Sequence, residues 1–260
     1  MMNPVISNIR IYPIKSLDGI ELSSVEIGTR SLLHDREFAM LADDGRFVNG
    51  KRTGRVNQLH ANYDLPNYRV SFSERDSSSQ TSFHLVEEKE KIGSFLSDFF
   101  NMKISFLQNR EGRLLDIPDE SGITILSTAS LEYLSKSMKG HPVDDLRLRF
   151  RASLEITGVP AFWEEQLAIP SGQPVHFRAG EIKLAGISLR ARCNVPPKDP
   201  FTGDLDKSFV KKMLAARDKN VPEWSMVREF PSLYYLTVNC FIPDTETGKF
   251  IHIGDEVALL

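Results

Sequence analysis

The chain has 260 residues, of which 41% are hydrophobic and 26% charged, so it can bury a substantial core as one large domain or two ordinary ones. Its formal net charge of -3 excludes a nucleic-acid-binding protein that relies on an overall excess of Lys and Arg. Two cysteines cannot form a disulfide framework or ligate an iron-sulfur cluster, and six scattered histidines give no zinc-ligand spacing. We therefore predict a globular protein with no nucleic-acid partner.

The N-terminal residues lack the basic segment and the long apolar segment of a signal peptide, and nowhere do about 18 apolar residues run together. The sequence therefore predicts a cytoplasmic protein with no membrane partner, in which Cys193 and Cys240 are reduced thiols.

In the first half of the chain, short apolar runs alternate with turn residues, which is typical of strands and tight hairpins. Strands are predicted at 6–12, 19–22, 37–41, 46–48, 67–72 and 103–107. The helical spacing of Ile92, Phe95, Leu96 and Phe99 predicts a helix over 88–100. The polar, turn-rich stretch 108–122 is the best candidate linker, so we place the domains at 1–112 and 113–260.

The second half continues with strands and two helices. Strands are predicted at 124–126, 150–156, 174–179, 181–192 and 234–241, and helices at 131–139 and 207–217. Ser127 or Thr128 is the expected N-cap of the first of these helices. The ending, 249–259, alternates around a Gly-Asp turn, as small closed β-barrels do. The fold class predicted from this pattern is mainly β with a few helices, a β-rich α+β protein.

Cys193 stands where a predicted strand gives way to a loop containing three prolines. The flanking Arg190 and Arg192 favour a thiolate, the form that ligates metals. Because these arginines alternate with Ala191, they should share one face of the strand while Cys193 lies on the other. A buried, inert thiol is the alternative for Cys193, and the segment 199–203 alone indicates only a turn.

Arg192-Cys193 followed by Asp199-Pro200-Phe201-Thr202-Gly203 resembles the signature of the MOSC family, named for the C-terminal domain of molybdenum cofactor sulfurases. Three further segments, 12–16, 35–36 and 253–257, resemble the two-part arrangement of the mitochondrial amidoxime-reducing components and their bacterial relatives. The resemblance implies an N-terminal β-barrel-like domain over 1–112 and a MOSC β-barrel domain over 113–260.

The resemblance implies that Cys193 is the catalytic residue and the protein's ligand to the molybdenum of a Mo-molybdopterin cofactor. It also implies cofactor contacts for Lys15, Ser16, Arg36, Arg151, Arg192, Tyr235 and Ser121, and cationic and hydroxyl donors suit the phosphate of molybdopterin. Simpler interpretations remain open. Lys15 can be a solvated loop cation, Ser16 a turn residue, and Arg36 a partner of Asp35 or Glu37. Arg151 can be an exposed strand cation, and Tyr235 a core residue with Tyr234 on the opposite face.

The implied function is an oxidoreductase that reduces N-hydroxylated compounds. Electrons would come from a separate donor protein, such as a ferredoxin-like protein, a flavoprotein or a cytochrome, because the chain has no redox signature of its own. A non-catalytic cofactor carrier, or a sulfur carrier with a Cys193 persulfide, is the alternative, and a fold kept for structural reasons alone is a third. No pyridoxal phosphate site is predicted. The loop 194–198 departs from that of the amidoxime reducers, which leaves the substrate open.

Overall fold

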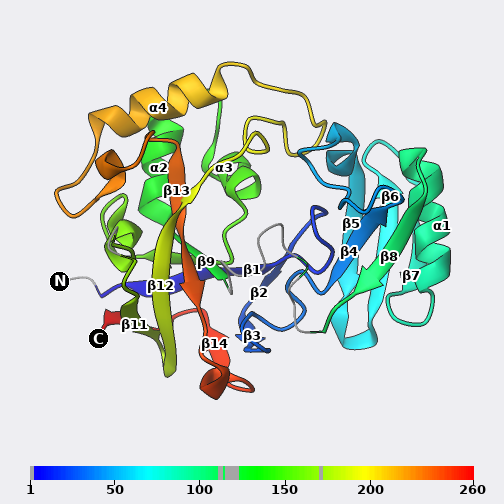
Figure 1. Cartoon of the computed structure of the whole chain (residues 1–260), viewed down its shortest axis with the longest axis horizontal. Helices are drawn as coiled ribbons and strands as arrows, with labels where there is room; N and C mark the ends of the chain where they lie inside the picture. Colours follow the sequence, from blue (N-terminus) through cyan, green and yellow to red (C-terminus); the bar gives the residue numbers. More distant parts are fainter. Residues whose placement is uncertain (1–2, 111–113, 115–122, 170–171) are drawn as a thin grey trace.

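The structure is a computed structural model that describes residues 3–110, 114, 123–169 and 172–260. Its largest element is an eight-stranded sheet with the order β15-β11-β12-β13-β9-β10-β1-β2 (Figure 1). The strands are β1 (Val5–Ile11), β2 (Ile20–Leu22), β9 (Ile123–Ser127), β10 (Leu154–Thr157), β11 (Val175–Ala179), β12 (Ile182–Ala191), β13 (Tyr235–Phe241) and β15 (Val257–Leu259). All neighbours pair antiparallel except β10 and β9, which are parallel.

Backbone hydrogen bonds between the start of β1 and the segment before β15 bend this sheet into a closed form. The N–H of Ile6 donates to the carbonyl of Asp255 at 2.8 Å, and the N–H of Gly254 donates to the carbonyl of Ile6 at 2.8 Å. The N–H of Val257 donates to Pro4 at 2.8 Å. The β15 end of the sheet therefore meets the start of β1, which closes the sheet as expected of a barrel.

A second group of strands lies to the right of the large sheet in Figure 1. β4 (Phe38–Ala42) pairs with β8 (Ile104–Gln108), and β5 (Leu59–Asp64), β6 (Arg69–Glu74) and β7 (Thr81–His84) form a three-stranded sheet beside helix α1 (Lys89–Phe100). The rings of Phe72 and Phe83 pack against Phe95 of α1 with centroids 5.4 and 5.6 Å apart. A small pair joins the two halves of the chain, because β3 (Ser24–Glu26) binds β14 (Phe250–His252).

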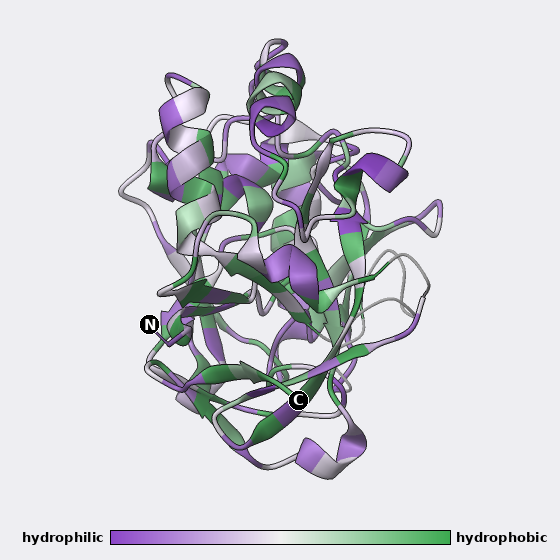
Figure 2. Ribbon diagram, turned by 90° about the vertical axis from the view of Figure 1, so that its left-hand side faces the viewer, coloured by the Kyte–Doolittle hydropathy of each residue, from purple (hydrophilic) through white to green (hydrophobic). Residues whose placement is uncertain are grey.

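Three helices cover one end of the large sheet: α2 (Thr128–Ser137), α3 (Val143–Phe150) and α4 (Phe209–Lys219). Leu131, Leu134, Phe150, Phe209 and Met213 form the centre of their shared core, which is separate from the core of the strands. Short 3-10 helices complete the described chain: η1 (Gly54–Asn57), η2 (Leu65–Asn67), η4 (Trp163–Leu167), η5 (Val227–Glu229) and η6 (Asp244–Glu246). Figure 2 shows hydrophobic residues interspersed with hydrophilic ones along strands and helices, as expected of elements with one buried face.

The predicted fold class, mainly β with a few helices, is confirmed. The helices predicted at 88–100, 131–139 and 207–217 correspond to α1, α2 and α4, and Ser127 is the N-cap of α2. The strand predicted at 150–156 is wrong at its start, because Phe150 ends helix α3 and Arg151 follows with a φ of 55°. Phe150 begins an apolar alternation with Ala152 and Leu154 that is typical of a strand, yet it also lies four residues after Leu146 and shares a helix face with it.

The domain division at residue 112 stays a prediction. Strands from both sides of it pair within one sheet, because β1 binds β10 and the segment before β15. Across the described ranges, none of the helices is both long enough and apolar enough to cross a bilayer.

The close contact between β12 and η4 can be tested by substitution, and it matters because β12 ends just before Cys193. A Cβ atom on Gly186 of β12 would lie 1.8 Å from the carbonyl oxygen of Leu167, so Gly186→Ala must displace backbone. We expect it to lower the free energy of unfolding by about 3 kcal/mol or more, measured by urea denaturation. Gly28→Ala is the control, because its Cβ would meet neighbours only at 3.5 Å and beyond. Equal stability of the two variants would contradict this packing.

Candidate functional site

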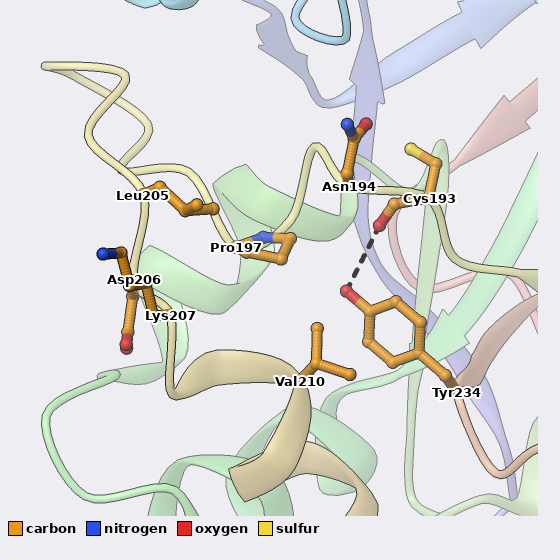
Figure 3. Close-up of a pocket in the computed structure, with 8 residues that line it drawn as sticks. All are labelled: Cys193, Asn194, Pro197, Leu205, Asp206, Lys207, Val210 and Tyr234. Atoms are coloured by element: carbon orange, nitrogen blue, oxygen red, sulfur yellow. Dashed lines mark hydrogen bonds between the residues drawn. The ribbon is translucent and has the colours of Figure 1, made fainter.

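Cys193 lies exposed, two residues beyond the end of β12. The hydroxyl of Tyr234 donates to the carbonyl of Cys193 at 3.3 Å, and Figure 3 shows the sulfur pointing to the opposite side of the chain from that carbonyl. Burial raises the pKa of Tyr234 to about 12, although Arg192 opposes the shift, so its hydroxyl remains a donor at neutral pH. The alternative of an inert buried thiol is wrong for Cys193 and describes Cys240, where burial raises the pKa.

A buried arginine fixes the loop that follows the cysteine. One nitrogen of Arg149, Nη1, donates to the carbonyls of Pro196 at 2.9 Å and Lys198 at 2.6 Å. Its Nε donates to Asp145 Oδ2 at 2.7 Å, which balances the guanidinium charge. Arg149 was not among the predicted site residues. Its i, i+4 pairing with Asp145 on α3 resembles an ordinary exposed helical ion pair, so the sequence gives little indication of its role.

The segment from Asp199 to Gly203 folds as a side-chain-capped turn. Asp199 Oδ1 accepts the N–H groups of Phe201 and Thr202, both at 2.9 Å. Burial acts to raise the pKa of Asp199, but these N–H groups and Arg149 hold it below its ordinary value. Gly203 takes a φ of 80°, and its N–H donates to the carbonyl of Asp199 at 3.0 Å. The predicted turn is therefore confirmed, with Asp199 as the residue that stabilises it.

This loop crosses to the strands of the other half of the chain, where it lies near η1 (Figure 1, yellow). Gln58 Nε2 donates to the carbonyl of Thr202 at 3.1 Å, and the Arg75 guanidinium lies 4.9 Å from the centroid of Phe201. At Gly203, a Cβ atom would lie 2.4 Å from the carbonyl oxygen of Gly54. Two glycines thus allow the two backbones to touch, and this contact fixes the loop that carries Cys193.

A cluster of arginines surrounds Tyr12 of β1's C-terminal continuation. The guanidinium carbons of Arg36 and Arg151 lie 4.5 and 3.8 Å from the centroid of the Tyr12 ring. The main chain holds the group together, because Tyr12 N–H donates to Asp35 Oδ1 at 2.8 Å and Arg36 N–H donates to the Tyr12 carbonyl at 2.9 Å. Arg151 Nη2 also donates to the carbonyl of Leu17 at 2.7 Å. The structure thus brings together three segments that carry predicted cofactor contacts.

Arg192 links this cluster to the cysteine. Its Nη2 donates to the carbonyl of Phe150 at 3.0 Å, and the guanidinium lies close to both Cys193 and Tyr12. Burial, with the nearby Arg190, lowers the pKa of Arg192 to about 10. Burial also lowers the pKa of Arg151, with Arg36 acting in the same direction. Cations whose charges are destabilised in this way favour an anionic ligand.

The other predicted contacts are placed as follows. Lys15 is buried, with Nζ 4.0 Å from the centroid of Phe47, so it is not the solvated loop cation of the simpler interpretation. Ser16 lies in a tight turn with a φ of 73°. Tyr235 packs against Phe230 with ring centroids 4.7 Å apart, while Tyr234 contacts Cys193. Ser121 lies outside the described residues.

Ser127, the N-cap of α2, and Ser130 in the first turn of that helix bind a buried glutamate. Ser127 Oγ accepts the N–H of Ser130 at 3.2 Å, and Ser130 Oγ donates to Glu164 Oε1 at 2.7 Å. Glu164 is fully buried, and this burial, together with the charge of Glu165, raises its pKa to about 7. These serines therefore hold a buried carboxyl group at the base of α2.

Comparison with known proteins agrees with the motifs. Residues 3–111 match the model of the family described as "MOSC N-terminal beta barrel domain". The chain is 24% identical to the molybdenum cofactor sulfurase of Caenorhabditis briggsae over 98% of this chain and 36% of that protein. It is 26% identical to mitochondrial amidoxime reducing component 2 of Bos taurus over 78% of this chain and 68% of that protein. The chain thus spans about a third of the length of the sulfurase it matches.

A solved structure, the YUAD protein from Bacillus subtilis, aligns with 12% identity over 100% of this chain and 98% of that one, at a TM-score of 0.41. The family matches confirm the resemblance drawn from the sequence.

The contact between Gly203 and Gly54 can be tested with a matched pair of variants. Gly203→Ala places a Cβ against the Gly54 backbone at a φ of 80°, whereas Gly248→Ala places one in open space at a φ of 83°. Both pay roughly 1–2 kcal/mol for the left-handed backbone. We expect Gly203→Ala to lose roughly 1–3 kcal/mol more in urea denaturation. Equal losses would contradict the close approach.

The buried Glu164 yields a prediction on pH. Because its pKa is raised from 4.5 to about 7, the folded state binds more protons than the unfolded state between these values, and stability falls as pH rises through this window. We expect Glu164→Gln, compared with wild type, to gain about 3 kcal/mol between pH 4.5 and pH 7.5. Urea denaturation across this range measures the gain.

Glu132→Gln on the exposed face of α2 is the control for this experiment, and its curve should follow that of wild type. Parallel curves for wild type and Glu164→Gln would show that Glu164 has the same pKa in the folded and unfolded states, which would contradict the prediction.

Proposed function

Because residues 3–111 carry a MOSC N-terminal beta barrel domain, we propose that the protein binds a molybdenum cofactor and acts with it as an oxidoreductase. The observation that carries the proposal is the exposed thiol of Cys193 beside a buried cationic cluster. The relatives named as molybdenum cofactor sulfurase and amidoxime reducing component support a role linked to this cofactor.

The side chains around Cys193 suit both the metal of such a cofactor and its anionic end. In the described part of the chain, no three His, Cys, Asp or Glu side chains gather to hold a metal ion, so a metal at Cys193 would take its other ligands from the cofactor. Arg36, Arg151 and Arg192 supply cations for an anionic end of the ligand. Buried Nε of Arg192 has no hydrogen-bond partner within the described ranges, which leaves a donor for the ligand.

In the proposed complex, Cys193 is the protein's thiolate ligand to molybdenum. Arg36, Arg151 and Arg192, with Lys15 and Ser16, hold the phosphate and the pterin, and contacts from Tyr235 and Ser121 are part of the proposal. When bound, the cofactor supplies the two-electron redox chemistry that side chains lack. Tyr234 and Arg149 act on the main chain, because they fix the carbonyls around Cys193 and so keep its sulfur at one place.

The finer proposal concerns the reaction. The relative named amidoxime reducing component supports reduction of an N-hydroxylated compound, in which two electrons and two protons convert an N–OH group to N–H and release water. The electrons come from a separate donor protein, such as a ferredoxin-like protein, a flavoprotein or a cytochrome. Asn194 and Pro197, in the loop that departs from the amidoxime reducers, line a pocket of about 410 Å³ beside Cys193 (Figure 3). Their position suggests that the substrate differs from that of those relatives.

A second candidate is a carrier of the cofactor, or of sulfur as a Cys193 persulfide, without turnover. The exposure of Cys193 and the similarity to proteins named molybdenum cofactor sulfurase favour it.

Expression in a host that makes molybdopterin separates these functions. The wild type should contain molybdenum and a fluorescent pterin and should reduce an amidoxime with a chemical reductant. Cys193→Ala should lose molybdenum and activity by more than about 100-fold, since even outer-shell changes cost 10–100-fold. It should keep the thermal stability of wild type, because Cys193 is exposed.

Cys240→Ala is the matched control, with full metal content and activity despite some loss of core packing. Well-folded wild type without molybdenum or pterin would refute the proposal. Cofactor without turnover would favour the carrier, and a mass increase of one sulfur atom that Cys193→Ala abolishes would favour the persulfide.

A further inference from the structure

Tyr12 buries a hydroxyl group that finds no hydrogen-bond partner within the described ranges. The residue is only 1% exposed. Buried tyrosine hydroxyls are ordinarily paired, because leaving such a group unsatisfied costs stability. The contacts of the ring with Arg36 and Arg151 need only its aromatic face, which a phenylalanine would supply equally well. The hydroxyl therefore has no role in the packing of the protein by itself.

The surroundings of this hydroxyl are cationic. Burial raises the pKa of Tyr12, while Arg151, Arg10 and Arg36 all lie close enough to act against the rise. Asp35 is the acidic group that acts on Tyr12, and its carboxylate already binds the Tyr12 N–H and pairs with Arg36. Asp18 acts in addition on Arg151, so Tyr12 lies among three arginines and one carboxylate that act on it, with a second carboxylate beside Arg151.

Further unpartnered donors lie around the same residue. Arg10 pairs with Glu21 through Nη2, but its Nε is buried without a partner in the described chain, as is Nε of Arg192. Both arginines lie near Tyr12. A buried tyrosine hydroxyl with unpartnered guanidinium N–H groups on neighbouring arginines suits a ligand with several acceptor oxygens and a negative charge. The cluster reaches solvent through Arg36, whose side chain is 16% exposed.

We propose that Tyr12 is a further ligand-binding residue, whose hydroxyl donates a hydrogen bond to an oxygen of a phosphate group that Arg36 and Arg151 neutralise. The inference deepens the proposed function and rests on it only for the identity of the ligand, because molybdopterin ends in a phosphate and a free phosphate ester has the same chemistry. Lys15 and Ser16, three and four residues further along the same segment, are the contacts that the family resemblance implies. The resemblance implies no contact from Tyr12, so its hydroxyl is an additional donor.

Two opposite effects of one substitution distinguish this role from a structural one. Tyr12→Phe removes an unpartnered buried hydroxyl, so the unliganded protein should be as stable as wild type or more stable. The same change should weaken binding of phosphate, because the hydrogen bond to a charged group is lost. A tyrosine that serves only packing would also tolerate the change to phenylalanine, but phosphate binding would then be unchanged, so the loss of phosphate binding is the discriminating result.

The experiment measures the thermal midpoint of the purified full chain against inorganic phosphate, with sodium chloride at equal ionic strength as the reference. The wild type should be stabilised by phosphate beyond chloride, and Tyr12→Phe should need about tenfold more phosphate for the same rise. Tyr133→Phe is the matched control, since its hydroxyl donates to the carbonyl of Ala216 at 3.0 Å. That variant should lose basal stability and respond to phosphate as wild type does.

A measurement on the unsubstituted residue complements the variants. With fluorotyrosine incorporated, the fluorine resonance of Tyr12 should move on addition of phosphate and that of Tyr133 should not.

A wild type that responds to phosphate and chloride equally would overturn the proposal, as would a Tyr12→Phe variant with the wild-type response. The failures are separable: molybdenum-free protein with a Tyr12-dependent phosphate response contradicts the proposed function alone. Loaded protein in which Tyr12→Phe changes neither pterin content nor phosphate response contradicts this inference alone.

Discussion

The position of Cys193 depends on the hydrogen bonds that Arg149 donates to the carbonyls of Pro196 and Lys198. Pro196, Pro197 and Pro200 have no amide hydrogen, so this segment cannot continue the ladder of β12. Its buried carbonyls still need donors, and a guanidinium group supplies several from one side chain. The proline-rich loop and the buried arginine therefore act together. The prolines end the strand pairing of β12, and Arg149 binds the carbonyls of the loop and so fixes its position.

The backbone at two arginines of the cationic cluster around Tyr12 is strained, and hydrogen bonds hold it in that conformation. Arg36 and Arg151 both take left-handed conformations, with φ of 54° and 55°, which cost a residue with a Cβ roughly 1–2 kcal/mol each. Hydrogen bonds from Arg36 N–H to Tyr12 and from Arg151 N–H to Arg147 hold them there. Strained residues that bring like charges together are typical of binding sites rather than of cores. Here the strain turns both side chains toward one aromatic ring.

Local patterns in the sequence were sufficient for most of the fold. The helical spacing of α1 and the capping serine of α2 depend on neighbours within one or two turns, and both were predicted correctly. The error at Phe150 arose where two periodicities coincide, because Phe150 alternates with Ala152 and Leu154 as in a strand and also lies four residues after Leu146 as in a helix. The choice was made by the core between α3 and α4, where Phe150 packs near Phe209. Contacts of that range are not visible in the local pattern.

The candidate site shows the same division between local and distant information. Cys193 and the turn at Asp199 could be predicted, since their signal lies within a short segment. Arg149 and Tyr12 could not, because each acts on residues distant in the chain: Arg149 on Pro196, and Tyr12 through Arg36 and Arg151. Their residue types carry no signal by themselves, for an arginine on a helix and a tyrosine after a strand are ordinary. What distinguishes them is a buried donor whose partner is a main-chain carbonyl in one case and, by the proposal above, a ligand in the other.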